Sequence, residues 1–126
     1  MNSSVYDDFV SWLERIGTSP PRPQAIAAYN FGIFESESGY VVYLVGANKY
    51  DPEDDDWACS QDYVPREKYF NLPKSFPGRK KWAGVQREVA GFVKQFIKSP
   101  VFENSFLARA SAITVGFDDG ELQRVR

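Results

Sequence analysis

The sequence predicts an α+β fold, an antiparallel β-sheet with two main helices packed against it. Three observations carry this prediction. Two segments repeat apolar residues at helical spacing, four shorter segments have strand-like composition, and the strand-like segments form two pairs with short links. Short links favour antiparallel pairing, because parallel strands need long crossovers. The length fits one domain, residues 1–126.

The first helix is predicted to begin at Ser4, which has Asp7 three residues later as in a capping box. Gly17 is expected to end it. Its apolar residues follow helical spacing: Val5, Phe9, Trp12, Leu13 and Ile16. Residues 18–23 contain three prolines and therefore predict a stiff extended connector.

Residues 25–35 and 40–47 are predicted strands, and the polar, glycine-ended link 36–39 makes them a hairpin. The second strand is apolar on both faces. Two interpretations are open: a central strand covered on both sides, or a strand covered on one side that contacts a partner on the other.

Residues 48–81 are the least regular part of the chain, and long irregular segments are often functional. Within them, residues 57–60 are compatible with a short strand and residues 66–71 with a short helical turn. A second amphipathic helix of about 17 residues is expected from Trp82, ending at Ser99 and Pro100.

The last segments predict a second hairpin. Residues 110–117 alternate between large apolar and small or polar residues, and the sequence Asp-Asp-Gly at 118–120 is typical of a tight turn. Residues 121–125 complete the pair.

Missing residue types limit the chemistry of the chain. It contains no histidine, which excludes Ser–His and Cys–His nucleophilic systems and the commonest general base. The sequence contains neither the phosphate-binding motif GxxxxGK[ST] nor the motif GxGxxG. One cysteine cannot make an internal disulfide, which favours a reducing compartment, and Cys59 is expected to be a small buried core residue. No catalytic residue, metal site or cofactor is predicted.

The cellular expectations follow from composition. The N-terminal residues lack the basic and apolar regions of a secretory signal, and no apolar run is long enough to span a bilayer. We therefore expect a cytoplasmic protein without a membrane partner. Four bases precede the second helix: Lys74, Arg79, Lys80 and Lys81. The isoelectric point near 5.2 argues against nucleic-acid binding.

The net charge of −2 conceals an uneven distribution. Residues 1–63 carry 11 acids and 3 bases, a balance of −8, whereas residues 64–126 carry 6 acids and 12 bases, a balance of +6. Either the molecule is dipolar, or the two halves neutralise each other across the fold.

The densest acidic run lies at residues 51–56. It fails the calcium-loop pattern, because Asp56 occupies the glycine position and Asp62 the final glutamate position. Five acids in six residues repel one another unless an external cation relieves them. The run and its aromatic neighbours are therefore candidate partner-binding residues: Tyr50, Asp51, Glu53, Asp54, Asp55, Asp56, Trp57, Asp62 and Tyr63. The alternative is a solvated loop whose aromatic residues turn inward.

Residues 28–72 resemble small bacterial immunity proteins of toxin–immunity systems, including contact-dependent inhibition. The resemblance lies in the aromatic-rich hairpin, the segment YDPEDDDWAC, and the short C-terminal helix and strand. It implies a cytosolic protein that binds and blocks a toxin domain, often a basic nuclease.

The leading hypothesis is a non-enzymatic immunity or inhibitor protein that binds a protein partner, such as a basic toxin domain, through the acidic and aromatic surface. The alternative is a regulatory or structural subunit of a bacterial protein assembly, using a sheet face or the basic helix face of Arg87, Lys94 and Lys98. The third hypothesis is an enzyme that uses carboxylates alone. The oligomeric state is not predicted.

Overall fold

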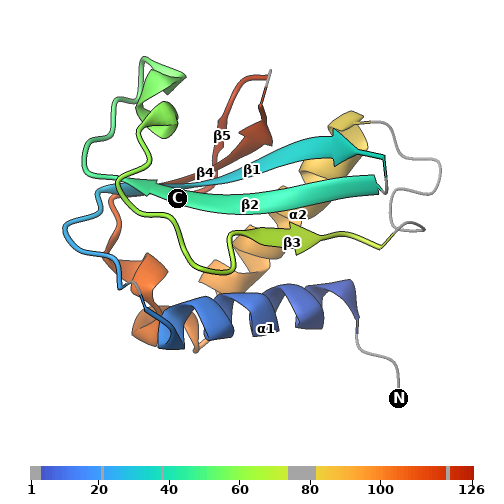
Figure 1. Ribbon diagram of the computed structural model, residues 1–126, viewed down its shortest axis with the longest axis horizontal. Coiled ribbons are helices and arrows are strands. Elements are labelled where there is room, and N and C mark those ends of the chain that lie inside the picture. Colours follow the sequence, from blue (N-terminus) through green and yellow to red (C-terminus); the bar gives the residue numbers. More distant parts are fainter. Residues whose placement is uncertain (1–3, 21, 38, 74–81, 119) are drawn as a thin grey trace.

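The computed structural model describes residues 4–20, 22–37, 39–73, 82–118 and 120–126. Its centre is a five-stranded sheet with the order β3-β2-β1-β4-β5 (Figure 1). The strands are β1 (Ala28–Ser36), β2 (Gly39–Ala47), β3 (Tyr69–Asn71), β4 (Ala112–Phe117) and β5 (Gln123–Arg124). The main helices are α1 (Val5–Thr18) and α2 (Trp82–Ile97), and both lie against the same face of the sheet. The predicted α+β class is confirmed.

Both main helices form where their apolar spacing predicts. The Ser4 hydroxyl accepts a hydrogen bond from the Asp7 backbone N–H at 3.0 Å, which caps the first turn of α1. The helix runs past Gly17 to Thr18, and the Ser19 N–H closes its end on the Ile16 carbonyl. Within the described ranges, neither helix has the length and apolar composition to cross a membrane.

The two predicted hairpins are present, and a parallel pair joins them. Strands β1 and β2 pair antiparallel from Ser36↔Gly39 to Ala28↔Ala47. Strands β4 and β5 also pair antiparallel, although β5 is shorter than residues 121–125. Strands β1 and β4 run parallel, with Ala28 opposite Ala112. A tight turn fixes direction within a hairpin, but the long connection between the hairpins does not.

The main core lies between the sheet and the two helices. Alternate strand residues face the helices, and Leu44, Phe31 and Val115 stand side by side across β2, β1 and β4. Phe9 and Trp12 of α1 are fully buried against this face. The Phe9 ring centroid lies 5.6 Å from that of Phe31. Burial of these rings is a main stabilising contribution, because each removes a large apolar area from water.

The opposite face of the sheet is covered by residues 50–58 and the chain after β4. Ala47, Ala28 and Ala112 lie in one row across β2, β1 and β4, and Trp57 packs on these small side chains. Farther along, the Tyr43 ring crosses Gly32, where an added Cβ would lie only 2.0 Å from that ring. Strand β2 is therefore covered on both sides, which confirms the first of the two interpretations.

Three expectations in the irregular segment are wrong. Residues 57–60 do not form a strand, because a 3₁₀ helix, η1 (Asp55–Cys59), occupies this position. Residues 66–71 are not a helical turn, since β3 extends the sheet there by pairing with β2. Cys59 is exposed rather than buried. The buried side chain of η1 is Trp57, and a 3₁₀ helix with three residues per turn directs Cys59 away from that face.

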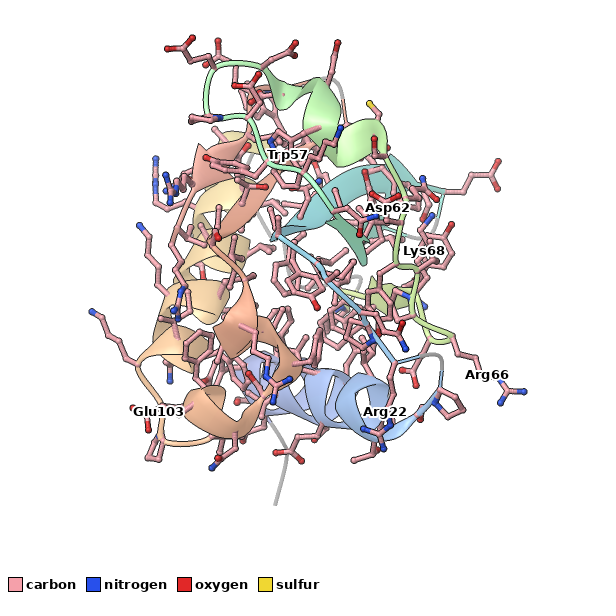
Figure 2. All side chains as sticks on the ribbon, turned by 90° about the vertical axis from the view of Figure 1, so that its left-hand side faces the viewer. Arg22, Trp57, Asp62, Arg66, Lys68 and Glu103 are labelled. Atoms are coloured by element: carbon pink, nitrogen blue, oxygen red, sulfur yellow. The ribbon has the colours of Figure 1, made fainter. Side chains whose placement is uncertain are left out.

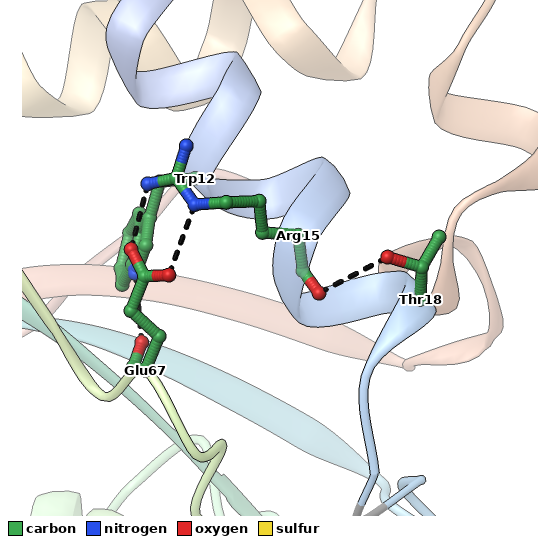
Figure 3. Close-up of polar contacts among 4 residues, drawn as sticks. All are labelled: Trp12, Arg15, Thr18 and Glu67. Carbon is green, nitrogen blue, oxygen red and sulfur yellow. Dashed lines mark hydrogen bonds and ion pairs between the residues drawn. The ribbon is translucent and has the colours of Figure 1, made fainter.

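Side-chain contacts hold the chain just before β3 against α1. The Trp12 indole Nε1 donates a hydrogen bond of 2.7 Å to the Glu67 backbone carbonyl (Figure 3). The Arg15 guanidinium donates two hydrogen bonds to the Glu67 carboxylate, at 2.9 and 2.6 Å. This fork geometry lowers the pKa of Glu67, chiefly through the hydrogen bonds from Arg15.

Candidate functional site

Hydrogen bonds to the backbone give the acidic segment a defined shape. The Asp51 carboxylate accepts the Glu53 N–H at 2.9 Å, and the Asp54 carboxylate accepts the Asp56 N–H at 3.0 Å. Asp54 is thereby the N-cap of η1. The Asp55 carboxylate accepts the Leu122 N–H at 3.1 Å, which fastens η1 to the chain after β4.

A second connection closes the segment at its other end. The Asp62 carboxylate accepts the Asn48 backbone N–H at 2.8 Å, so the chain leaving β2 is tied to the chain that follows η1. The Gly46 and Tyr63 backbones exchange two hydrogen bonds, at 2.9 and 3.0 Å. These contacts bring residues 48–51 and 54–62 around a common space.

That space is a hollow of about 510 Å³, which we call the acidic hollow. Its lining residues are Asn48, Lys49, Asp51, Asp54, Asp56, Trp57, Ser60 and Asp62. Four carboxylates and one ammonium group give the lining a formal balance of −3. Trp57 is 8% exposed, so most of its ring serves as a support packed on the alanine row. In Figure 2, the labelled Trp57 and Asp62 lie in the upper half of the molecule.

The negative balance of the acidic hollow favours a cationic ligand. In the described part of the chain, no group of three or more histidine, cysteine or acidic residues is arranged to hold a metal ion. Carboxylates distributed around a hollow match an arginine or lysine side chain, which can form charge-assisted hydrogen bonds with several of them.

Of the nine predicted residues, five line the acidic hollow: Asp51, Asp54, Asp56, Trp57 and Asp62. Glu53 and Asp55 are exposed but do not line it. The Tyr50 ring packs edge-on against Trp57, with 5.2 Å between centroids.

Tyr63 lies elsewhere, in the main core. It is 4% exposed, and its ring meets Tyr29 and Phe106. Burial raises the pKa of Tyr63 to about 12. Its hydroxyl has no hydrogen-bond partner among the residues that the structure describes.

The sequence reasoning missed three lining residues: Asn48, Lys49 and Ser60. It also missed Arg124 of β5, whose guanidinium lies 5.2 Å from the centre of the Tyr50 ring. The position of Asn48 and Lys49 directly after a strand was an available signal, since residues at strand ends often line sites. Nothing local indicates Arg124, because its contact spans more than seventy residues.

The sequence analysis also singled out two groups of basic residues. Lys74, Arg79, Lys80 and Lys81 lie outside the described residues. Arg87 and Lys94 are exposed on α2, and Lys98 is exposed directly after its end. The one ion pair within the described ranges, Arg15–Glu67, joins a base of the acidic half to an acid of the basic half. Among the described residues, no ion pair involves the acidic run.

Comparison with known proteins adds no further constraint. No protein-family model matches the chain, and neither does any curated protein or solved structure.

Proposed function

We propose that this protein is a non-enzymatic binding protein of the immunity type, which neutralises a cognate bacterial toxin by direct contact in the cytoplasm. The acidic hollow is the centre of its binding surface. The partner presents a basic surface, such as that of a nuclease toxin domain, and inserts an arginine or lysine side chain among the four carboxylates.

The single observation that supports this proposal most strongly is the arrangement of Asp51, Asp54, Asp56 and Asp62 around one hollow. Placing like charges together destabilises the free protein, and a cationic partner relieves that repulsion on binding. Three of the four carboxylates also accept backbone hydrogen bonds. Because those side chains are already fixed, less conformational entropy is lost when the partner binds.

Electrostatics also determine the expected kinetics. A surface with a negative balance steers a basic partner during diffusion, so association is fast at low ionic strength and slows as salt is added. The resemblance of residues 28–72 to immunity proteins leads to the same class of partner.

The experiment begins with the gene's immediate neighbour. If it encodes a toxin, its toxic domain is co-expressed with this protein in bacteria, and growth and complex formation by size-exclusion chromatography are measured. We expect growth to be restored and a complex to form. A toxic neighbour that is neither bound nor neutralised would contradict the proposal.

A charge-removal variant then tests the acidic hollow itself. Replacing all four carboxylates with amides (Asp51→Asn, Asp54→Asn, Asp56→Asn and Asp62→Asn) removes the charge but keeps oxygen acceptors for the backbone hydrogen bonds. We expect protection against the toxin to be lost while the circular dichroism spectrum is retained.

The matched control removes the same number of charges elsewhere. It changes four exposed glutamates: Glu14→Gln, Glu37→Gln, Glu88→Gln and Glu103→Gln. This control should still protect. Equal loss of protection in both variants would mean that only net charge matters, and the acidic hollow would no longer be the binding site.

The alternative, a subunit of a protein assembly, is favoured by the exposed bases Arg87 and Lys94 on α2 and Lys98 directly after it. Charge reversal at these three positions distinguishes the two functions. It should break an assembly that uses the helix face, and it should leave the toxin complex intact.

A further inference from the structure

A second hollow, of about 450 Å³, lies where the chain after α1 meets the short helices η2 (Phe102–Asn104) and η3 (Phe106–Arg109). We call it the arginine hollow. It shares no lining residue with the acidic hollow. In Figure 2, the labelled Arg22 lies beside the end of α1, in the lower half of the molecule and far from Trp57.

The arginine hollow has the opposite charge. Arg22 and Arg109 line it, and its lining contains no acidic residue. Arg22 and Arg109 are both exposed. Among the described residues, neither guanidinium group forms an ion pair or a hydrogen bond. Two such groups beside one hollow favour a phosphate or carboxylate, whose oxygens a guanidinium group binds in pairs.

Apolar side chains form the inner wall. The rings of Tyr29 and Phe106 meet edge to face with centroids 5.4 Å apart, and Ile26 lies beside them. Tyr29 is only 2% exposed, so its ring is held firmly by the core. Behind this wall lies Tyr63, in contact with both rings. A rigid apolar wall next to two cations is suited to a ligand with an apolar body and an anionic head.

The backbone of this wall is strained at one residue. Ala25 lines the arginine hollow with φ of 55°, in the left-handed region that is unfavourable for an L-residue with a Cβ. The strain is maintained because the next residues are fastened to the sheet: Ala27 donates to the Ala47 carbonyl at 2.8 Å and accepts from the Ser111 N–H at 2.7 Å. Such strained residues are concentrated at binding sites.

We propose that the arginine hollow binds a small organic anion. Its phosphate or carboxylate lies between Arg22 and Arg109, and its apolar body packs on Phe106 and Ile26, with the buried Tyr29 ring behind them. The volume falls within the range of roughly 300–1,000 Å³ that is typical of small-molecule sites. The site goes beyond the proposed function, and its test requires no toxin.

The test uses phenyl phosphate and benzoate, which share an apolar ring and differ in the anionic head. Each is titrated into ¹⁵N-labelled full-length protein, and amide chemical shifts are followed. We expect saturable shifts at Ile26, Tyr29 and Phe106 for at least one probe. The tighter probe identifies the head group. Absence of saturable shifts with both probes up to about 10 mM would overturn the proposal.

Two comparisons test the two halves of the ligand. Phenol lacks the anion and inorganic phosphate lacks the ring, so each should bind at least about tenfold more weakly than the tighter probe. Equal binding by phenol would overturn the role of the arginines. Equal binding by inorganic phosphate would overturn the role of the aromatic wall.

Matched variants separate the site from general charge. Arg22→Gln with Arg109→Gln should raise the dissociation constant of the tighter probe at least about tenfold. The control Arg66→Gln removes an exposed arginine that does not line the arginine hollow. It should change the dissociation constant of the tighter probe less than about twofold. If the double variant binds as tightly as wild type, or if the control weakens binding equally, the proposal is wrong.

Discussion

Replacement of Trp57 by alanine should destabilise the protein strongly, because this ring supports the acidic hollow on the alanine row of the sheet. Trp57 is 8% exposed. A buried indole removes about 200 Å² from water, which at about 25 cal/mol/Å² corresponds to about 5 kcal/mol. Alanine retains about 1 kcal/mol of this, so we expect a loss of about 3–5 kcal/mol, the usual range for such truncations. A loss of that size is a large part of the total stability of a domain.

Trp82 provides a matched control for the same substitution. It is 61% exposed, so it hides only about two-fifths of the same area and Trp82→Ala should cost at most about 2 kcal/mol. The measurement is urea unfolding followed by far-UV circular dichroism, with the free energy of unfolding obtained by linear extrapolation. If Trp57→Ala costs no more than Trp82→Ala, the support of η1 by the sheet is refuted.

Two further predictions concern the buried Tyr63. Tyr63→Phe removes a hydroxyl that has no hydrogen-bond partner among the described residues. In the same unfolding assay, we expect this substitution to be neutral or to stabilise the protein by up to about 1 kcal/mol. A loss of stability above about 2 kcal/mol would contradict this expectation. Burial raises the pKa of Tyr63 from 10 to about 12, so the unfolded chain ionises first and stability should fall as the pH rises from about 10 to about 12. Tyr63→Phe should make that fall shallower, and an unchanged slope would show that Tyr63 does not contribute to it.

The sequence predicted both main helices and both hairpins, because these depend on signals that are local. Periodic apolar residues, the Ser4 cap and the turn sequences act within a few residues of the structure they produce. The parallel pairing of β1 with β4 joins segments more than eighty residues apart, and nothing in either segment encodes its direction. Strand β3 is three residues long, too short to show alternation, so only its partner in β2 defines it.

The acidic hollow was predictable in part. Charge density singled out the acidic run, but it gave no information on which side chains share a hollow. Asp62 joins Asp51 and Asp54 only because its carboxylate binds the Asn48 backbone, fourteen residues earlier. Tyr63, the next residue, faces the main core instead, since successive residues of an extended chain point in opposite directions. The arginine hollow had no local signal, because its two arginines lie far apart in the sequence.

The choice of variant for a direct test of partner binding follows from the hydrogen bonds. Reversing the charge of Asp54 or Asp55 would also remove a hydrogen bond that shapes the segment. Asp56 lines the acidic hollow and Glu53 does not, although the two lie three residues apart. Both residues are exposed, and neither side chain accepts a hydrogen bond from the described residues. Asp56→Lys and Glu53→Lys therefore change the net charge of the protein equally, but only Asp56→Lys changes the charge of the acidic hollow's lining.

The most direct measurement is the dissociation constant of the complex with the toxin domain, obtained by isothermal titration calorimetry for wild type, Asp56→Lys and Glu53→Lys at one salt concentration. Our account predicts that Asp56→Lys raises the dissociation constant at least about tenfold, whereas Glu53→Lys raises it less than about threefold through long-range charge alone. Equal effects of the two variants, or no effect of Asp56→Lys, would contradict the claim that the acidic hollow receives a cationic side chain of the partner.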